Sequence, residues 1–395
     1  MNPHYLIHIS GDDQPGVAAA LMAHLADAKA DVVDVELITV RGRLHLSALI
    51  SVASERPLLK ELLIMGWERG FHIDFEPVEA HEAGMDAKRK APWFAVTVLG
   101  HDIGSDAMAA ATAAIAGLGA NIERITCLAR YPVTAYELVI STTDIDPIRA
   151  QLVEESRRFH FDVAVQPEGL RRRAMRLVAL DVDSTLIQDE VIELLAEEAG
   201  CLEEVARLTA AAMAGELDFE RSLRARVALL AGLDEAVLER ARQRLRLTPG
   251  ARTFVRTLKR MGFATMIVSG GFTHFTDALK AELGLDYAFA NELEIINGRL
   301  TGQLVGPVVD RRRKGDILAE VALAEGIELH QTVAIGDGAN DLDMLARAGL
   351  GIAFNAKPVV ADAAHTALNV PFLDAVLFVL GIRREDVEAA DAHPL

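Results

Sequence analysis

The feature that most constrains the fold is a regular alternation of apolar runs and long helical segments after residue 175. The apolar runs are RLVALDV, FATMIVSG and TVAIGD, and helical patterns such as 315–325 lie between them. Parallel strands need crossover connections, which are usually helices. The alternation therefore predicts an α/β fold with a doubly wound parallel sheet.

One long stretch interrupts this alternation. Residues 188–247 carry helical patterns and no strand signal, so we expect a helical insertion directly after the first strand. Ligands bind at the carboxyl ends of the strands in open α/β sheets. An insertion at this point would cover that edge.

The first 166 residues contain an internal repeat with an offset of about 90 residues. Each copy begins with an apolar strand, HYLIHISGDD or WFAVTVLGHD, turns, and enters an alanine-rich helix followed by alternating strands. A second helix of each copy is predicted at 57–67 and at 146–158. The resulting order, βαββαβ, predicts two ferredoxin-like units.

These patterns divide the chain into three domains and their connections. The predicted domains are the βαββαβ units at 1–80 and 93–166 and the sheet with its insertion at 175–385. The predicted connections are polar linkers at 81–92 and 167–174 and a loosely ordered, charged tail at 386–395.

Composition excludes several classes of protein. The formal charge of −18 over 395 residues argues against nucleic acid and anionic membranes as partners. Two distant cysteines, Cys127 and Cys201, form no CxxC motif and favour a reducing compartment over a disulfide framework. Neither a signal-peptide pattern nor a stretch of about 18 uncharged apolar residues occurs, so we expect a soluble cytoplasmic protein.

Polar side chains follow the strands of the predicted sheet where each strand ends. The groups are Asp181 and Asp183 after the first strand, Ser269-Gly270-Gly271 after the second, Lys314 at the start of a helix, and GDGAND (336–341) after the third. Two neighbouring carboxylates disfavour each other's ionised forms unless a cation lies between them, so DVD predicts a metal ion. A nucleophile, a metal ion, backbone N–H groups and an ammonium are what phosphoryl transfer requires.

The segments DVDST, SGG, Lys314 and GDGAND, in this order, resemble the four motifs of the haloacid dehalogenase phosphatase superfamily. The insertion resembles that of the phosphoserine phosphatases, and the two βαββαβ units resemble ACT domains. The resemblance covers essentially the whole chain except the linkers and the tail. It implies a haloacid dehalogenase-like core with a helical cap, and hydrolysis of O-phospho-L-serine to L-serine and phosphate, the final step of serine biosynthesis.

The resemblance also implies a role for each motif residue. Asp181 is expected to be the nucleophile that forms an aspartyl-phosphate, and Asp183 the proton donor and acceptor. Mg²⁺ is expected at Asp181, the Asp183 carbonyl and Asp337, with Asp341 in support. The expected substrate-binding residues are Glu190, Met213, Phe219, Arg226, Ser269, Gly270, Gly271, Lys314 and Asn340. Glu190 would meet the substrate ammonium and Arg226 its carboxylate.

The ACT resemblance implies an amino-acid effector, expected to be the product L-serine, and a homodimer. The candidate regulatory residues are Asp13, Gly16 and Asp31 in the first unit and Asp102, Gly104 and Asn121 in the second. Helix N-termini at these turns expose N–H groups that suit a carboxylate. The alternative is that the repeats only dimerise the enzyme.

Two other functions remain open at this level. One is a different small phosphomonoester hydrolase or phosphotransferase, against which Glu190 and Arg226 argue. The other is an amino-acid sensor with an inactive phosphatase domain, against which the presence of Asp181 argues.

Overall fold

The computed structural model describes residues 2–53, 55–79, 91–213 and 218–392, apart from the side chains of residues 55, 56 and 213. The chain forms two compact units, Met1–Lys90 and Ala91–Leu395. The predicted linker at 81–92 lies almost entirely outside the described residues. Within the described part of the chain, no helix combines the length and apolar character needed to cross a bilayer.

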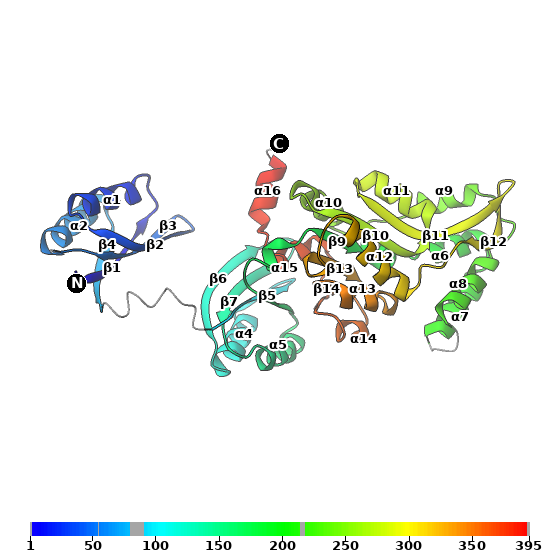
Figure 1. Cartoon of the computed structure of the whole chain (residues 1–395), viewed down its shortest axis with the longest axis horizontal. Coiled ribbons are helices and arrows are strands. Elements are labelled where there is room, and N and C mark those ends of the chain that lie inside the picture. Colours follow the sequence, from blue (N-terminus) through cyan, green and yellow to red (C-terminus); the bar gives the residue numbers. More distant parts are fainter. Residues whose placement is uncertain (1, 54, 80–90, 214–217, 393–395) are drawn as a thin grey trace. The chain divides into compact units, whose positions relative to one another are not determined.

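The first unit is the predicted βαββαβ fold (Figure 1). Its elements are β1 (His4–Asp12), α1 (Val17–Asp27), β2 (Asp31–Val40), β3 (Arg43–Ser51), α2 (Glu55–Arg69) and β4 (His72–Val78). The strands form an antiparallel sheet in the order β2-β3-β1-β4. Alternate side chains of β1 and β3, such as Ile7, Ile9 and Leu46, pack against Leu21 and Leu25 of α1.

The second unit begins with the same fold. Its elements are β5 (Trp93–Gly100), α4 (Ser105–Gly117), β6 (Asn121–Ala129), β7 (Thr134–Ser141), α5 (Asp146–Phe159) and β8 (Asp162–Pro167). The sheet order, β6-β7-β5-β8, matches that of the first unit. Both predicted ferredoxin-like units are therefore confirmed.

A seven-stranded sheet follows, in the order β12-β11-β10-β9-β13-β14-β15. Its strands are β9 (Leu177–Leu180), β10 (Ala264–Phe272), β11 (Tyr287–Ile296), β12 (Arg299–Val305), β13 (Thr332–Gly336), β14 (Leu350–Phe354) and β15 (Thr366–Leu368). All are parallel except β12, which pairs with β11 as an antiparallel edge. The three predicted strands are β9, β10 and β13 at the centre, where burial on both faces makes the sequence uniformly apolar.

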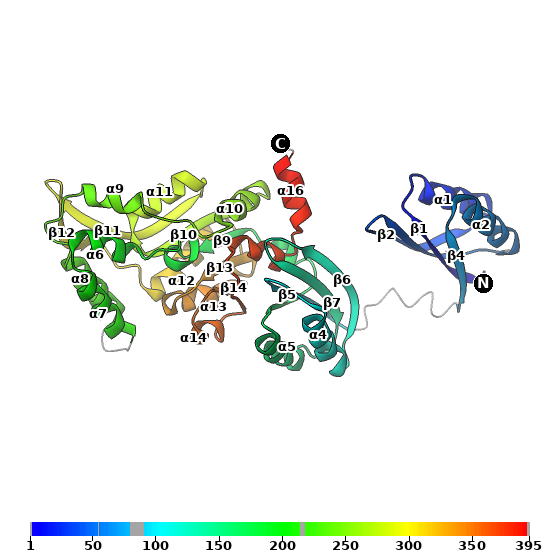
Figure 2. The ribbon, with the colours of Figure 1, turned by 180° about the vertical axis from the view of Figure 1, so that it is seen from behind.

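Helices cover both faces of this sheet, which confirms the doubly wound prediction. The helices α10 (Ala251–Arg260) and α11 (Thr273–Leu283) pack on one face with Val178, Leu180 and Ile267. The helices α12 (Arg311–Ala324) and α13 (Leu342–Arg347) pack on the other with Leu177 and Ala179. Figure 2 shows the sheet and its helices from behind.

The predicted helical insertion forms a cap after β9. Its helices are α6 (Val191–Ala199), α7 (Leu202–Met213), α8 (Phe219–Ala228) and α9 (Ala236–Arg242). The two segments that join the cap to the sheet lie side by side, because Ile187 and Leu247 form an antiparallel bridge. Arg246 also binds Asp189 across this junction, with 2.7 Å between Nη2 and Oδ1.

The second βαββαβ unit and the seven-stranded sheet share one hydrophobic core. Leu99 and Leu128 of the former belong to the same buried cluster as residues of β9 and α10. Buried polar groups also cross the junction. Asn369 donates to both oxygens of Asp162 at 2.6 and 2.7 Å, and Gln166 donates to the Val379 carbonyl at 2.8 Å. Burial raises the pKa of Asp162.

Two segments differ from the sequence prediction. The predicted linker at 167–174 is anchored by Arg172, whose buried side chain binds Glu137 and Glu168 at 2.6 and 2.9 Å. The predicted loose tail instead forms α16 (Arg384–Ala392), whose Asp391 pairs with arginines of α10. Charge suggested solvent exposure in both places, but here the charged side chains find partners on neighbouring elements. Residues 393–395 lie outside the described part.

This division predicts unequal effects of two truncations. Removing residues 1–90 takes away one self-contained unit, so the rest should unfold at the same temperature as in the full chain. Removing 1–166 exposes the shared core and leaves Asn369 without its partner, so the unfolding midpoint should fall by more than about 10 °C, or the protein should aggregate. Thermal unfolding followed by circular dichroism measures both. Equal stability of the two truncated chains would contradict the shared core.

Candidate active site

The central strand β9 delivers Asp181 to the edge of the sheet. The strand is only four residues long and lies between β10 and β13, fully buried. Asp181 follows directly, 4% exposed, and its backbone N–H still bonds to the Ile335 carbonyl at 2.9 Å. The chain then bends sharply, with Ser184 in the left-handed region at φ 56°. Residues two apart on an extended chain share a face, so Asp181 and Asp183 can serve one site, and backbone strain such as that at Ser184 is typical of functional sites.

Lys314 lies at the bottom of the site, in the first turn of α12. Its side chain is fully buried, and Nζ lies 2.5 Å from Asp181 Oδ1 and 2.7 Å from Asp341 Oδ1. Burial alone would lower the pKa of Lys314, but the two carboxylates outweigh it and the net shift is upward. The Asp310 side chain caps α12 by accepting from the Arg313 N–H at 2.7 Å. The buried ammonium therefore joins the ends of β9 and β13.

The loop that contains Asp341 fixes the position of its side chain. Its second oxygen accepts from the Gly338 N–H at 3.0 Å. Gly336 must be glycine, because a Cβ there would lie 2.5 Å from Asp341 Cγ. Both carboxylate oxygens of Asp341 are thus engaged, so this side chain positions Lys314.

Asp183 faces the loop that follows β10. Its Oδ1 accepts from the Val191 N–H at 2.9 Å, and its Oδ2 accepts from the Ser269 hydroxyl at 3.2 Å. Ser269 Oγ in turn accepts from the Gly271 N–H at 2.7 Å. Burial, and then the nearby Glu190 carboxylate, raise the pKa of Asp183 to about 7. This carboxyl can therefore exchange a proton near neutral pH.

The site holds more buried negative charge than Lys314 balances. The carboxylates of Asp181, Asp337 and Asp341 lie within 4.8 Å of one another. Burial and then Asp341 raise the pKa of Asp181 well above its usual value and that of Asp337 to about 7. Oxygen ligands with a missing counter-charge fit a hard divalent cation. Asp181 and Asp337, two of the three predicted metal ligands, belong to this group of carboxylates. The third predicted ligand is the backbone carbonyl of Asp183, and the Asp183 side chain is not part of the group.

The cap brings its predicted substrate residues to the same place. Glu190 precedes α6, accepts from the Ser184 hydroxyl at 2.8 Å, and has a pKa raised by burial. Among the described residues, the hydrogen bonds of the Arg226 side chain in α8 are long, 3.3 Å to the Ser222 carbonyl and 3.5 Å to Thr209 Oγ1. Burial lowers the pKa of Arg226, while Glu190 and Asp183 oppose that effect. The guanidinium therefore lies within electrostatic reach of both carboxylates.

Three further predicted residues complete this picture. Phe219 reaches the loop after β10, because a Cβ placed on Gly270 would lie 3.1 Å from Phe219 Cζ. The same position lies 3.9 Å from Asn340 Nδ2, so both side chains border this loop. The backbone of Met213 ends α7, but its side chain lies outside the described residues.

The regulatory residues predicted for each βαββαβ unit are not brought together within it. Asp13 and Gly16 lie beyond the end of β1, which pairs with the start of β3 at Arg43. Asp31 starts β2 at the other end of the sheet, opposite Ser51. Because the helix returns along the strand, the turn before it and the turn after it lie at opposite ends of the sheet.

The second unit shows the same separation. Asp102 and Gly104 follow β5, whereas Asn121 pairs with Ser141 at the opposite end. Asn121 lines a separate cavity of about 350 Å³ there. The candidate residues of each unit are therefore divided between the two ends of its sheet.

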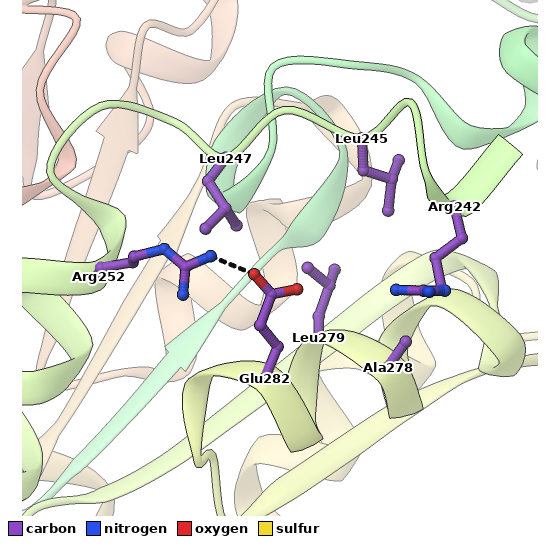
Figure 3. A pocket seen from close by; sticks show the side chains of 7 residues that line it. All are labelled: Arg242, Leu245, Leu247, Arg252, Ala278, Leu279 and Glu282. Carbon is purple, nitrogen blue, oxygen red and sulfur yellow. Dashed lines mark hydrogen bonds and ion pairs between the residues drawn. The ribbon is translucent and has the colours of Figure 1, made fainter.

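A cavity of about 270 Å³ lies beside the cap junction and contains none of the predicted site residues (Figure 3). Leu245 and Leu247 border it on one side, and Leu279 and Glu282 of α11 on the other, with Arg252 bound to Glu282. Both arginines that line it are already paired with carboxylates, Arg242 with Glu239 at 2.6 Å. The predicted catalytic side chains do not line this cavity; they contact one another directly, as Lys314 does Asp181 and Asp341.

Two polar residues at the site were missed by the sequence analysis. Thr185 donates to Asp337 Oδ1 at 3.2 Å. Asn291 of β11 binds the loop after β10. Asparagine is depleted in strands, so its occurrence here could have drawn attention to this position.

Comparison with known proteins agrees with this arrangement. Residues 178–346 match the haloacid dehalogenase-like hydrolase family, and residues 4–76 and 94–166 match ACT domain families. The chain is 55% identical over 391 residues to a phosphoserine phosphatase of Streptomyces coelicolor, covering 98% of this chain and 95% of that protein. It is 45% identical over 393 residues to a phosphoserine phosphatase of Mycobacterium tuberculosis, with the same coverage.

Solved structures show the same likeness. A haloacid dehalogenase family hydrolase from Salmonella enterica serovar Typhi superposes with a TM-score of 0.65 at 32% identity, covering 73% of this chain and 98% of that one. A phospho-aspartyl intermediate analogue of phosphoserine phosphatase superposes with a TM-score of 0.50 at 45% identity, covering 52% and 98%. The chain belongs to the phosphoserine phosphatase family of haloacid dehalogenase-like hydrolases, and it carries two ACT domains ahead of the hydrolase domain.

Proposed function

We propose that this chain hydrolyses O-phospho-L-serine to L-serine and phosphate, the final step of serine biosynthesis. The observation that carries the proposal is the buried cluster of Asp181, Lys314 and Asp341 beneath a cap that presents Glu190 and Arg226. Relatives that match the chain over nearly its whole length carry the name phosphoserine phosphatase. The two unpaired cysteines fit a cytoplasmic setting.

The proposed reaction has two displacements at phosphorus. An Asp181 carboxylate oxygen attacks the phosphoryl group, the bond from phosphorus to the serine oxygen breaks, and Asp183 gives that oxygen its proton. Water then attacks the aspartyl-phosphate, Asp183 takes the proton of the water, and Asp181 is regenerated as phosphate leaves. The raised pKa of Asp183, about 7, suits both proton transfers.

We infer that Asp181, Asp337 and the Asp183 carbonyl would hold Mg²⁺. When bound, the ion would supply the missing positive charge for the carboxylates and for the phosphoryl oxygens. The support is the excess of buried carboxylates whose pKa values are raised. Asp341 would keep Lys314 in place to neutralise the phosphoryl group.

The phosphoryl oxygens would be bound by the loop after β10. The Ser269 hydroxyl and the Gly270 N–H would be the donors, Gly271 holds Ser269 by donating to its Oγ at 2.7 Å, and the Asn340 amide borders the same loop. Donors fixed in a buried, water-poor site need no reorganisation as charge develops, which is why such loops stabilise transition states.

The serine part of the substrate would lie under the cap. Glu190 would bind its ammonium and Arg226 its carboxylate, and the long existing bonds of Arg226 leave its guanidinium able to accept that partner. Phe219, together with Met213, would form the apolar wall that excludes water.

The first prediction concerns the nucleophile and the metal. Asp181→Asn should lower phosphate release from O-phosphoserine by at least about a thousandfold, since no covalent intermediate can form. Removing divalent metal with EDTA should abolish activity, and added Mg²⁺ should restore it. Asp277→Asn, an exposed aspartate of α11, is the matched control and should keep wild-type activity. Undiminished turnover by the Asp181 variant would reject the proposed reaction.

The second prediction separates substrate choice from chemistry. Glu190→Gln and Arg226→Ala should each lower kcat/KM for O-phosphoserine by about a hundredfold, because a buried charge on the substrate loses its partner. Cleavage of p-nitrophenyl phosphate, which has neither group, should change by less than about threefold. Arg224→Ala on the same helix is the control, since Arg224 pairs with Glu220 at the surface. An equal loss on both substrates would show that these residues do not select serine.

We also propose that L-serine lowers activity by binding at the turns before α1 and α4, in a homodimer. Gly16 and Gly104 open these helices, and their N–H groups suit a carboxylate. Asp13 and Asp102 remain the candidates for the ammonium. The matching ACT families and the presence of two units support an effector role.

The third prediction tests this regulation in the full chain. The double variant Asp13→Ala/Asp102→Ala should need about tenfold more serine for half inhibition, because the ammonium loses its partner. Phosphate release as a function of serine concentration gives the value. Asp74→Ala, an exposed aspartate on β4, is the control. If the double variant keeps wild-type serine sensitivity, the effector does not bind at these turns.

A further inference from the structure

Asn291 is a buried amide in the second strand from one edge of the seven-stranded sheet. It lies in β11, is 2% exposed, and stands opposite Phe272 of β10. All of its hydrogen-bonding groups have partners. Nδ2 donates to the Gly270 carbonyl at 2.8 Å and to the Gly271 carbonyl at 3.2 Å, while Oδ1 accepts from the Val309 N–H at 2.8 Å.

The reason for this amide is an irregularity in the ladder between β10 and β11. Val268 pairs with Phe289, and Phe272 pairs with Asn291. Between these two pairs β10 runs four residues along the chain while β11 runs only two, so β10 carries two extra residues. The extra residues carry Ser269 and the two glycines away from regular pairing and toward the site. Their carbonyls then point back at β11, where the side chain of Asn291 meets them in place of a backbone N–H. A buried carbonyl without a donor would be costly.

The other end of the amide reaches the segment that starts α12. Val309 precedes Asp310, whose side chain caps that helix and whose carbonyl accepts from the Lys314 N–H at 2.9 Å. Asn291 therefore connects two parts of the site that are distant in sequence: the loop proposed to bind phosphoryl oxygens and the helix that carries Lys314.

We propose that Asn291 is a positioning residue for phosphoryl transfer, which holds the Ser269–Gly271 loop at a fixed distance from Lys314. The proposal rests on the proposed function. Only an amide of this length offers donors on one side and an acceptor on the other. Aspartate would face two carbonyl oxygens with a carboxylate, and alanine would leave three backbone groups unpaired. A displacement of about 1 Å between catalytic groups can cost about a hundredfold in rate.

The expected signature is a loss of kcat with little change in KM. The loop and Lys314 act on the phosphoryl group as charge develops, while the cap binds the serine part of the substrate. Asn291→Ala and Asn291→Asp in the full chain should lower kcat for O-phosphoserine by about tenfold to a hundredfold and change KM by less than about threefold. The inhibition constant of inorganic phosphate, a direct reading of the loop, should rise by at least about fivefold.

A matched control separates positioning from stability. Thr366 is also buried, and its hydroxyl donates to the Val163 carbonyl at 2.8 Å, far along the sheet toward the second ACT domain. Thr366→Val should lower the unfolding midpoint as the Asn291 variants do, yet keep kcat and phosphate inhibition at wild-type values. Should Asn291→Ala fail to fold, Asn291→Ser, which keeps one donor, provides the measurement and should show a smaller loss of kcat.

Two outcomes are distinguishable. If folded Asn291 variants keep kcat and phosphate inhibition within twofold of wild type, the positioning role is wrong. If the wild-type chain cleaves p-nitrophenyl phosphate but not O-phosphoserine, the proposed substrate is wrong. The role of Asn291 is then still decided by the same kcat and phosphate measurements on the aryl ester.

Discussion

The structure depends on one buried cation. Lys314 has no access to water, so its charge must be met by carboxylates within hydrogen-bond distance, and Asp181 and Asp341 supply them at 2.5 and 2.7 Å. This condition requires the ends of β9 and β13 to lie side by side, which the parallel pairing of these two central strands provides. It also requires α12 to begin beside them, and the Asp310 side chain caps α12 at that point.

The carboxylates around Lys314 carry more negative charge than this one ammonium can balance. Asp183 and Asp337 each have a pKa raised to about 7, and burial raises the pKa of Glu190. Such a site favours a divalent cation and, above it, a substrate that carries an ammonium group. The cap is joined to the sheet through the paired segments at Ile187 and Leu247, close to both Asp183 and Glu190. Glu190, proposed to bind the substrate ammonium, and Asp183, proposed to transfer the proton, therefore share one short stretch of chain.

The two ACT domains differ in how they are connected to the hydrolase domain, and their sequence patterns do not predict this difference. Both show the same order of elements and the same strand order. The second shares a core with the hydrolase domain and binds it through Asp162, Gln166 and Arg172, whereas the first forms a unit of its own. Residue patterns report which face of a strand is apolar, but a buried ion pair such as Arg172 with Glu137 looks like surface charge until its partner is located.

The sequence by itself determined the local structure and the chemistry of the motifs: the central strands, the helical cap, the repeated βαββαβ units, and the carboxylates, glycines and Lys314 at strand ends. These follow from periodicity and from residue types that only certain reactions need. Tertiary structure alone decided the flanking strands β11, β12, β14 and β15, the packing of α16, the separation of Asp13 from Asp31, and the contacts of Asn291. Each of these depends on contacts between segments far apart in the chain. A short pattern carries no information about which distant group will satisfy a buried carbonyl or pair a buried charge.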